Sequence, residues 1–567
     1  MTERHFCIKQ SVNNIAQRKS FRHKVSLQLL SSFIKPAQAI SISLLLIFAP
    51  ALPVAAAALE ASKSGQKSTE QKMRDGQKAM RDGQYPTAIK IYTEILGQDA
   101  ESVQTNLAIA FAYLKTLNYQ QCFDHANLVI KLNPENARAY ALAGAALLRS
   151  GYVSAASQQI VQAFKLNQKE PLAYGAAAEI DYYEGRTKES REKAFQAHWL
   201  EPDEPDYLVT IARAASRLEL FGEAADAYDR FLKVAPLTDV DRREKIEGLI
   251  RFYRKMDGVR VYQVAGQEQA EAPFSLGRDR RPYLKLQING RPARFVIDTG
   301  SYSTVVSEKS ARRLGISEVA RGGRSEGFGG NGKFPIIYGL IKNVQIGEAK
   351  VQSVPCFIRP FHAPEDHPED EKEDGLIGLA VLSSFLTELD YGAGKLKIDR
   401  SSGVIAPLQL PPDVRVIPFR TTQNGLISVE TEIDGGNKIN AILDSAAGSL
   451  VVSSAAVKRF NLAEQKIKGQ TIRVIGAAGV ADNVELLFVK NCRVADLQQQ
   501  NMRALILDFS VINETSGFEQ SGILGGDFLK NYKVTIDFAR AQIRLQPHST
   551  ESPRSDQLNR ATNDGDK

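Results

Sequence analysis

Two stretches of the chain repeat one pattern, Phe295-Val-Ile-Asp-Thr-Gly-Ser-Tyr-Ser-Thr-Val-Val-Ser307 and Ala441-Ile-Leu-Asp-Ser-Ala-Ala-Gly-Ser-Leu-Val-Val-Ser453, at an offset of 146 residues. A second pair of matching segments follows in the same order, Gly375-Leu-Ile-Gly-Leu-Ala-Val-Leu382 and Gly522-Ile-Leu-Gly-Gly-Asp-Phe-Leu529, at an offset of 147 residues. Two marker segments in one order and at a nearly constant offset indicate a duplicated structural unit. Asp298 and Asp444 occupy equivalent positions in its two copies.

Both copies have the residue pattern of β-structure. Residues 283–297 alternate apolar and polar side chains around an Asn289-Gly290 turn, and residues 426–443 do the same around Gly435-Gly436. Such alternation with a two-residue turn is typical of a β-hairpin. We therefore predict two all-β lobes, lobe 1 over residues 282–400 and lobe 2 over residues 414–547.

The Asp-Thr-Gly of residues 298–300 and the Asp-Ser-Ala of residues 444–446 each precede a hydrophobic–hydrophobic–Gly segment. This duplicated constellation resembles the pepsin and retroviral aspartic peptidase superfamily, in which two such lobes form one active site. The resemblance implies an aspartic endopeptidase with Asp298 and Asp444 as its catalytic pair. Two carboxylates held close together share one proton, so one acts as base on a water molecule and the other as acid on the peptide carbonyl. The resemblance implies no metal and no cofactor.

The same resemblance implies supporting roles for neighbours of the two aspartates. The hydroxyls of Thr299 and Ser445 are expected to form hydrogen bonds across the lobe interface, and Gly300 to let the backbone approach the carboxylates. Lobe 2 departs from the superfamily pattern, because Ala446 stands where glycine is usual. That departure keeps open an alternative, a catalytically inactive peptide-binding or scaffold protein.

Each lobe is also expected to contribute a hairpin flap that closes over the bound peptide. In lobe 1 the glycine-rich residues 325–334 carry Phe328, Gly329 and Gly330 as candidate substrate contacts. In lobe 2 residues 474–482 occupy the equivalent place and carry Gly476 and Ala477. The alternative interpretation is that both segments are ordinary surface turns.

A different repeat, with a period of 34 residues, precedes the β-rich region. Small residues recur on this period at Gly76, Ala110, Gly144, Ala178 and Ala212. They allow two helices of one unit to pack closely, and the period resembles the tetratricopeptide family. We predict an all-α tetratricopeptide solenoid over residues 68–257, ending in a capping helix, and a polar linker over residues 258–281. Such an array either binds a protein partner in its concave groove or only positions the next domain.

Residues 1–61 have the pattern of an export signal: seven Lys or Arg against two Glu, then an apolar run and an alanine-rich stretch. This basic–apolar–small order predicts a cleaved signal peptide and a periplasmic protein, with an uncleaved N-terminal membrane anchor as the alternative. The segment holds +5 of the total charge of +7, which leaves +2 for the other residues. Nucleic acid is therefore not an expected partner. The resemblance to aspartic peptidases implies a peptide or protein substrate.

The remaining features predict no further chemistry. Cys122, Cys356 and Cys492 lack the spacing of a disulfide framework or zinc site and are expected to be buried apolar residues. The acidic stretch of residues 364–374, with His362 and His367, is interpreted as a solvated loop rather than a metal site. Residues 548–567 are predicted to be a disordered tail.

Overall fold

The computed structural model describes residues 68–326, 333–360, 372–400, 410–476 and 479–548. Among these residues, no helix has both the length and the apolar character needed to cross a membrane. The segment predicted to be a signal peptide or anchor lies outside the described residues, as does all but His548 of the predicted tail.

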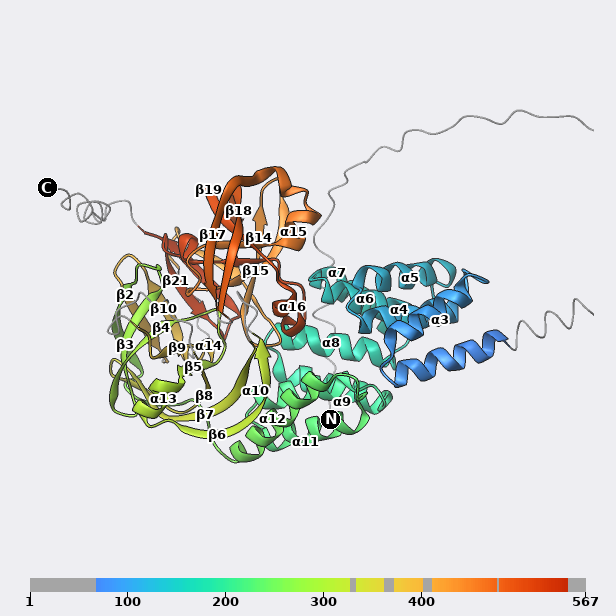
Figure 1. The fold of residues 1–567 in the computed structure, drawn as a ribbon, viewed down its shortest axis with the longest axis horizontal. Helices are drawn as coiled ribbons and strands as arrows, with labels where there is room; N and C mark the ends of the chain where they lie inside the picture. The colour runs from blue at the N-terminus through green and yellow to red at the C-terminus, as the bar shows by residue number, and fades with distance from the viewer. Residues whose placement is uncertain (1–67, 327–332, 361–371, 401–409, 477–478, 549–567) are drawn as a thin grey trace, which may run out of the picture. The chain divides into compact units, whose positions relative to one another are not determined.

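The first part of the described chain is an array of antiparallel helix pairs (Figure 1). After a first helix over residues 68–81, the helices are α3 (Tyr85–Leu96), α4 (Val103–Lys115), α5 (Tyr119–Leu132), α6 (Ala137–Arg149), α7 (Val153–Leu166), α8 (Pro171–Tyr183), α9 (Thr187–Leu200), α10 (Asp206–Arg217), α11 (Phe221–Val234) and α12 (Val240–Met256). The small residues of the repeat lie where helices meet: a Cβ at Gly144 would lie 2.8 Å from Ile160 of the neighbouring helix. The predicted tetratricopeptide solenoid is thus confirmed.

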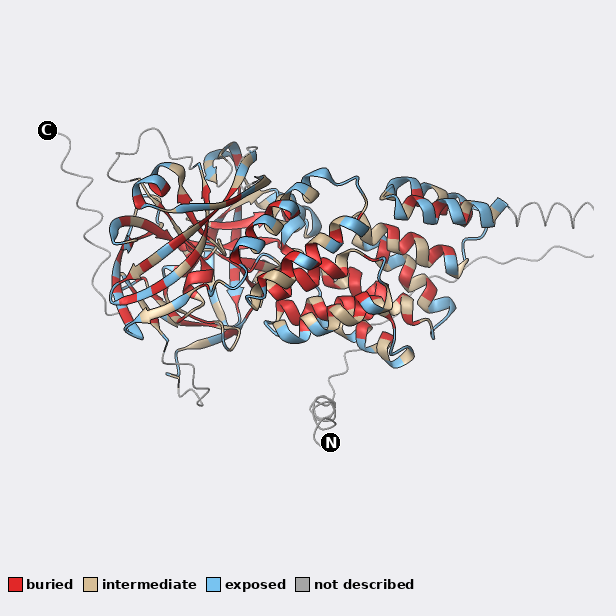
Figure 2. Ribbon diagram, turned by 90° about the horizontal axis from the view of Figure 1, so that it is seen from below, coloured by how far each residue is buried: buried red, intermediate tan, exposed pale blue. Residues whose placement is uncertain are grey.

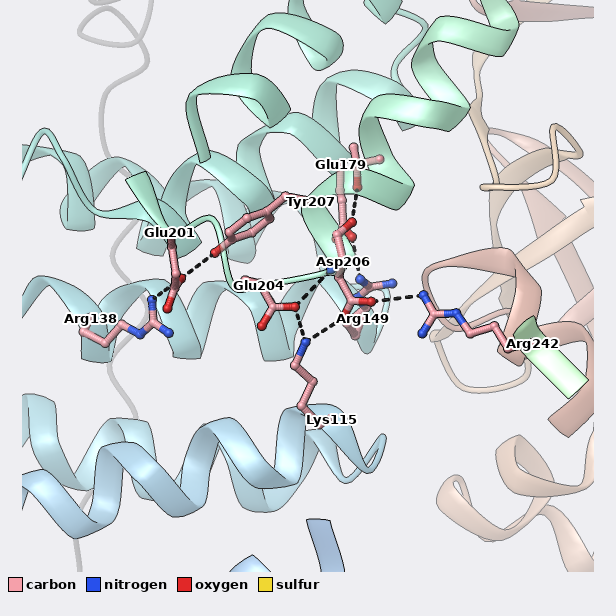
Figure 3. A network of polar contacts seen from close by, with 10 residues as sticks. Lys115, Arg138, Arg149, Glu179, Glu201, Glu204, Asp206, Tyr207 and Arg242 are labelled. Carbon is pink, nitrogen blue, oxygen red and sulfur yellow. Dashed lines mark hydrogen bonds and ion pairs between the residues drawn. The ribbon is translucent and has the colours of Figure 1, made fainter. Parts of the chain in front are cut away.

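Ion pairs connect helices that are far apart in the sequence of the array (Figure 3). Lys115, at the end of α4, pairs with Glu204, which precedes α10, and with Asp206, the first residue of α10, at 2.7 Å from Nζ to Oδ2. Arg242 of α12 donates to the other oxygen of Asp206 at 3.0 Å. Burial opposes the charge of Asp206, but these two cations hold the pKa of its carboxyl group below the ordinary value. The network therefore fixes the second, fifth and capping units of the array against one another.

The second part is β-rich, and buried residues are spread along its strands (Figure 2). These residues form one hydrophobic core that includes members of both lobes. Lobe 1 contains β3 (Pro282–Ile288), β4 (Arg291–Ile297), β5 (Thr304–Ser307), α13 (Glu308–Leu314), β6 (Ser317–Glu326), β7 (Lys333–Ile346), β8 (Ala349–Arg359), β9 (Gly375–Ile377), α14 (Leu379–Leu382), β10 (Leu386–Asp390) and β11 (Lys395–Asp399). Alternation of buried and exposed residues along β3 explains the hairpin that the sequence predicted.

Lobe 2 repeats this order. It contains β12 (Arg415–Pro418), β13 (Arg420–Thr421), β14 (Ile427–Ile433), β15 (Asn437–Leu443), β16 (Leu450–Ser453), α15 (Ser454–Arg459), η3 (Leu462–Gln465), β17 (Lys466–Gly476), β18 (Gly479–Val494), β19 (Leu497–Leu507), α16 (Ser510–Ser516), β20 (Gly522–Leu524), α17 (Gly526–Leu529), β21 (Tyr532–Asp537) and β22 (Gln542–Pro547). Strand β10 of lobe 1 pairs antiparallel with β21 of lobe 2, so the lobes share one sheet. The prediction of two all-β lobes is confirmed.

The prediction of a linker over residues 258–281 was wrong. Strand β1 (Gln263–Gly266) pairs with β8, and β2 (Gln269–Leu276) lies between β11 and β3 in the sheet shared by the lobes. Strand β2 alternates exposed polar residues with buried Ala270, Ala272 and Phe274. Its polar face and small buried residues gave it the composition of a linker, whereas its partner strand β11 begins more than a hundred residues later.

The helical array packs directly on both lobes. The ring of Phe252 in α12 stacks on Tyr338 of β7, with centroids 4.8 Å apart, and Gly248 of α12 lies against the backbone of Gly322 in β6. Lobe 2 meets the array at Phe518, whose ring lies 5.0 Å from that of Tyr183 in α8. The helical array and the two lobes, as far as the structure describes them, therefore form one packed unit rather than two domains joined by a free tether.

Candidate active site

The two aspartates occupy matching places in the lobes. Asp298 follows β4 and Asp444 follows β15, and each donates its backbone N–H to the last residue of the hydrophobic segment of its own lobe. These acceptors are the carbonyl oxygens of Ile377, at 3.0 Å, and Leu524, at 3.1 Å. The aspartate loops are therefore supported from behind by β9 and β20, and each of those strands pairs parallel with the strand before the aspartate and antiparallel with the strand after it.

The residues after the aspartates join the lobes through reciprocal hydrogen bonds. The backbone N–H of Thr299 donates to Ser445 Oγ at 3.0 Å, and the backbone N–H of Ser445 donates to Thr299 Oγ1 at 2.9 Å. Each hydroxyl then donates across the interface, Thr299 to the carbonyl of Leu443 at 2.8 Å and Ser445 to that of Ile297 at 2.7 Å. Both side chains are almost fully buried, so these four bonds fix one aspartate loop against the other.

Gly300 and Ala446 differ in the space available to them. A Cβ at Gly300 would lie 2.3 Å from the carboxyl carbon of Asp444, so only glycine fits there. Ala446 lines the cavity over the dyad and does not have a positive φ. The backbone at position 446 therefore has a conformation that alanine adopts without strain, although the superfamily pattern has glycine there.

Burial raises the pKa values of both carboxyl groups. For Asp298 the pKa rises to about 8, first through burial and second through the negative charge of Asp444, while the N–H of Gly300, 2.9 Å from Oδ1, opposes the rise. Burial also raises the pKa of Asp444, but its Oδ1 accepts two backbone N–H groups, from Ala446 at 2.8 Å and Ala447 at 3.0 Å. A hydrogen bond from Asp298 further lowers the pKa of Asp444. The arrangement therefore favours one proton held by the pair, and Asp444, with its two backbone donors, is the better placed of the two to carry the negative charge.

The structure places one predicted flap at the site. Strands β17 and β18 form a hairpin in which Gly476 pairs with Gly479, and Gly476 lines the cavity with Val474 and Ile475. Ala477 lies outside the described residues, as do Phe328, Gly329 and Gly330 of the lobe 1 flap. The described parts of that lobe 1 segment, β6 and the start of β7, pair with each other.

The aspartates open into a cavity of about 560 Å³ between the lobes. Sequence reasoning missed the residues of its walls. Arg281 had been assigned to a linker, and Arg359 at the end of β8 carried no motif, although both side chains line the cavity. The signal that finds them is the strand register, which makes Leu426 and Leu507 their equivalents in lobe 2.

Groups that bind metals are not gathered elsewhere in the described chain. No cluster of three or more His, Cys, Asp or Glu side chains forms a cation site among those residues. Cys122, Cys356 and Cys492 are buried free thiols, and burial raises the pKa of each. His362 and His367 lie outside the described residues.

Two all-β lobes, an aspartate at the equivalent place in each lobe and cross-lobe hydroxyl bonds define a bilobal aspartyl protease domain. Comparison with known families gives the same class. Residues 284–384 match the family "gag-polyprotein putative aspartyl protease", and residues 429–528 match the family "Aspartyl protease". The chain thus carries two retroviral-type aspartyl protease domains, one in each lobe.

Curated relatives include DNA damage-inducible protein 1 of Chaetomium globosum, 24% identical over 224 residues, which are 37% of this chain and 46% of the relative. Protein DDI1 homolog 2 of Danio rerio is 25% identical over 162 residues, 28% of this chain and 35% of the relative. DNA damage-inducible protein 1 of Saccharomyces cerevisiae is 29% identical over 119 residues, 20% of this chain and 25% of the relative. The chain therefore spans less than half the length of these relatives.

Solved structures similar to the helical array include a thermophilic TPR protein of Thermus thermophilus, with 19% identity and a TM-score of 0.28. That match covers 32% of this chain and 98% of the other. The MamA protein matches with 21% identity and a TM-score of 0.21, covering 30% of this chain and 92% of the other.

Proposed function

We propose that this protein is an exported aspartic endopeptidase that hydrolyses peptide bonds with a water molecule activated by Asp298 and Asp444. The observation that carries the proposal is the pair of carboxyl groups, Asp298 buried and Asp444 partly exposed to the cavity, on loops fixed by the Thr299–Ser445 bonds. The two family matches, one over each aspartate, support the same activity.

The mechanism follows from the asymmetry of the pair. Asp444, whose oxygen accepts two backbone N–H groups, is the ionised member and removes a proton from the water as its oxygen attacks the peptide carbonyl carbon. Asp298 is the protonated member and donates to the carbonyl oxygen, which gives a tetrahedral diol. Asp444 then gives the proton it took from water to the leaving nitrogen, a hydroxyl of the diol returns a proton to Asp298 as the C–N bond breaks, and the pair again holds a single proton.

The test is digestion of a peptide library by the wild type and by the Asp298→Asn and Asp444→Asn variants. We expect cleavage at acidic to neutral pH that declines as the pH rises through about 8, where burial and Asp444 place the pKa of Asp298. Either substitution should reduce kcat/KM by about 10²- to 10⁴-fold, the usual contribution of general acid–base catalysis. Cleavage at the wild-type rate by both variants would refute the dyad.

A second candidate is an inactive peptide-binding protein or scaffold, and Ala446 is the residue that favours it. The negative φ of Ala446 and the retention of Asp444 with both of its backbone donors support the active enzyme instead. Peptide binding without cleavage at any pH would favour the inactive protein.

Export to the periplasm rests on residues 1–61, and N-terminal sequencing of the protein recovered from a periplasmic fraction tests it. Recovery only from membranes, with the segment retained, would favour an anchor.

We further propose that the helical array recruits a protein substrate or partner. Trp199 of α9 is a candidate contact because 72% of its surface is exposed. Trp199→Ala should slow cleavage of an unfolded protein more than that of a short peptide; equal effects would argue against recruitment there.

A further inference from the structure

The strand registers relate each wall residue of lobe 1 to one of lobe 2. Tyr283 pairs with Val296 in lobe 1 as Ser428 pairs with Ile442 in lobe 2, and Val296 and Ile442 pair in turn with Leu376 and Ile523. Counting back two residues makes Arg281 the equivalent of Leu426. Strand β5 pairs with β8 as β16 pairs with β19, and this makes Arg359 the equivalent of Leu507.

The equivalent positions have opposite chemistry. Arg281 and Arg359 line the cavity from lobe 1, and Leu426 and Leu507 line it from lobe 2. Two acidic residues follow the same division. Asp279 and Glu373 line the lobe 1 wall, whereas their counterparts in lobe 2 are the uncharged Asn424 and Gln520. At all four positions lobe 1 is charged and lobe 2 is neutral.

The lobe 1 wall holds its guanidinium groups in defined places. Arg281 Nε lies 2.6 Å from Asp279 Oδ2, and Arg281 Nη1 lies 3.1 Å from Glu373 Oε1, so one guanidinium group contacts both acids of the wall. Arg359 lies over the ring of Phe334, 5.1 Å from its centroid, and its charge interacts with Asp298. Arg359 therefore presents an oriented cation beside the dyad, in surroundings where burial strengthens its attraction for an anion.

Apart from Asp444 itself, the lobe 2 wall is uncharged and mostly apolar, with Asn424, Ser449 and Thr515 as its polar side chains. Leu426, Leu507, Ile442, Val451, Leu505 and Ile523 line it. An aliphatic side chain that leaves water for such a wall gains roughly 1.5–3 kcal/mol, whereas a carboxylate would lose its hydration without gaining a partner.

A peptide bond at the dyad lies on the axis that relates the lobes, so the two side chains that flank it point toward opposite walls. We infer that the protease selects an acidic residue on the Arg359 side of the scissile bond and a large aliphatic residue on the Leu507 side. This inference rests on the proposed function, because it assigns the substrate class of the same site.

The first test is cleavage-site profiling of a peptide library by the full chain, with Arg359→Leu, Arg359→Lys and, as a matched loss of one positive charge, Arg415→Leu. Arg415 pairs with Asp496 on the surface of β12 and does not line the cavity. Wild type and Arg415→Leu should prefer Asp or Glu on one side of the cut and Leu, Ile or Phe on the other by about 10- to 100-fold in kcat/KM. Arg359→Leu should exchange the acidic preference for an aliphatic one, and Arg359→Lys should keep part of it.

The second test needs no turnover. Two uncleavable peptides with a hydroxyethylene group in place of the scissile bond carry either Glu and Leu or Leu and Leu at the flanking positions. Calorimetry should show at least tenfold tighter binding of the Glu peptide to the wild type and loss of that difference in Arg359→Leu. This result without any cleavage would support the specificity and refute only the proposed activity. Equal binding of the two peptides, or cleavage that favours basic or aliphatic residues on both sides, would overturn the inference even with an active enzyme.

Discussion

Replacing Gly300 by alanine adds one methyl group at the most crowded point of the active site. Its Cβ would lie 2.3 Å from both the carboxyl carbon and Oδ2 of Asp444, where ordinary contact needs 3.4 Å or more. The two groups must therefore separate by about 1 Å. The Asp444 carboxylate has little freedom to yield, because Ala446 and Ala447 donate to its Oδ1 at 2.8 Å and 3.0 Å.

The size of the effect follows from that displacement. A shift of about 1 Å in a reacting group lowers kcat/KM by on the order of 100-fold. Excess volume in a packed interior also lowers the free energy of unfolding, by about 1–3 kcal/mol. The loss of rate should exceed the loss of stability, since the crowded atoms belong to the dyad itself.

The assay combines peptide hydrolysis with urea denaturation of the same preparations. Gly97→Ala is the matched control, because Gly97 ends α3 with an ordinary helical φ of −64° and its nearest neighbour would be 3.5 Å from a new Cβ. We expect that control to keep wild-type kcat/KM within about twofold and to change stability by less than about 1 kcal/mol. Wild-type kcat/KM and stability in Gly300→Ala would refute the close contact on which the reasoning depends.

Three other predictions concern stability. Because burial and the charge of Asp444 raise the pKa of Asp298 to about 8, the folded state keeps a proton that the unfolded chain loses above about pH 4. The free energy of unfolding should therefore fall between pH 4 and 8, by up to about 1.4 kcal/mol per pH unit. Urea denaturation at several pH values should show a weaker dependence of this free energy on pH for Asp298→Asn than for the wild type. Thr299→Val should lower the free energy of unfolding by about 1–3 kcal/mol for each partner left unsatisfied, measured with guanidinium chloride. Phe252→Ala should cost about 3–5 kcal/mol and raise hydrogen exchange in β6 and β7, because it removes the ring stacked on Tyr338.

Each of these has its own control or contrary outcome. Equal pH slopes for wild type and Asp298→Asn would show that the unfolded and folded carboxyl groups titrate alike. Thr299→Ser keeps the hydroxyl, so it should retain most of the stability lost in the valine variant. Unchanged exchange in β6 and β7 with Phe252→Ala would mean that α12 does not hold these strands.

Most of the fold could be predicted from the sequence because each of the two repeats has a local pattern of residues that recurs along the chain. The 34-residue period specifies helix pairs, and the duplicated markers around Asp298 and Asp444 specify two equivalent lobes. Strand β2 escaped prediction because its partner β11 lies more than a hundred residues later, and Ala270 and Ala272 are too small to mark a buried face. The packing of α12 on β6 escaped for a related reason, since a glycine such as Gly248 gives no sign of the backbone it will meet.

Some residues of the site could be predicted from the sequence and others could not, for the same reason. Asp298, Thr299 and Ser445 belong to a motif, so they could be named before their contacts were known. Arg281 and Arg359 belong to none, and only the strand registers place them at the cavity and opposite two leucines. Wall residues of this kind depend on which strands become neighbours, and a single sequence does not state that directly.

The joining of both lobes in one chain, through the shared β10–β21 pairing, has a genetic consequence. In a protease built from two identical subunits, any codon change alters both halves of the cleft at once, so the halves must remain alike. Here a change at Arg359 leaves Leu507 untouched. Selection, natural or in the laboratory, can therefore adjust one side of the cleft while the other stays as it is.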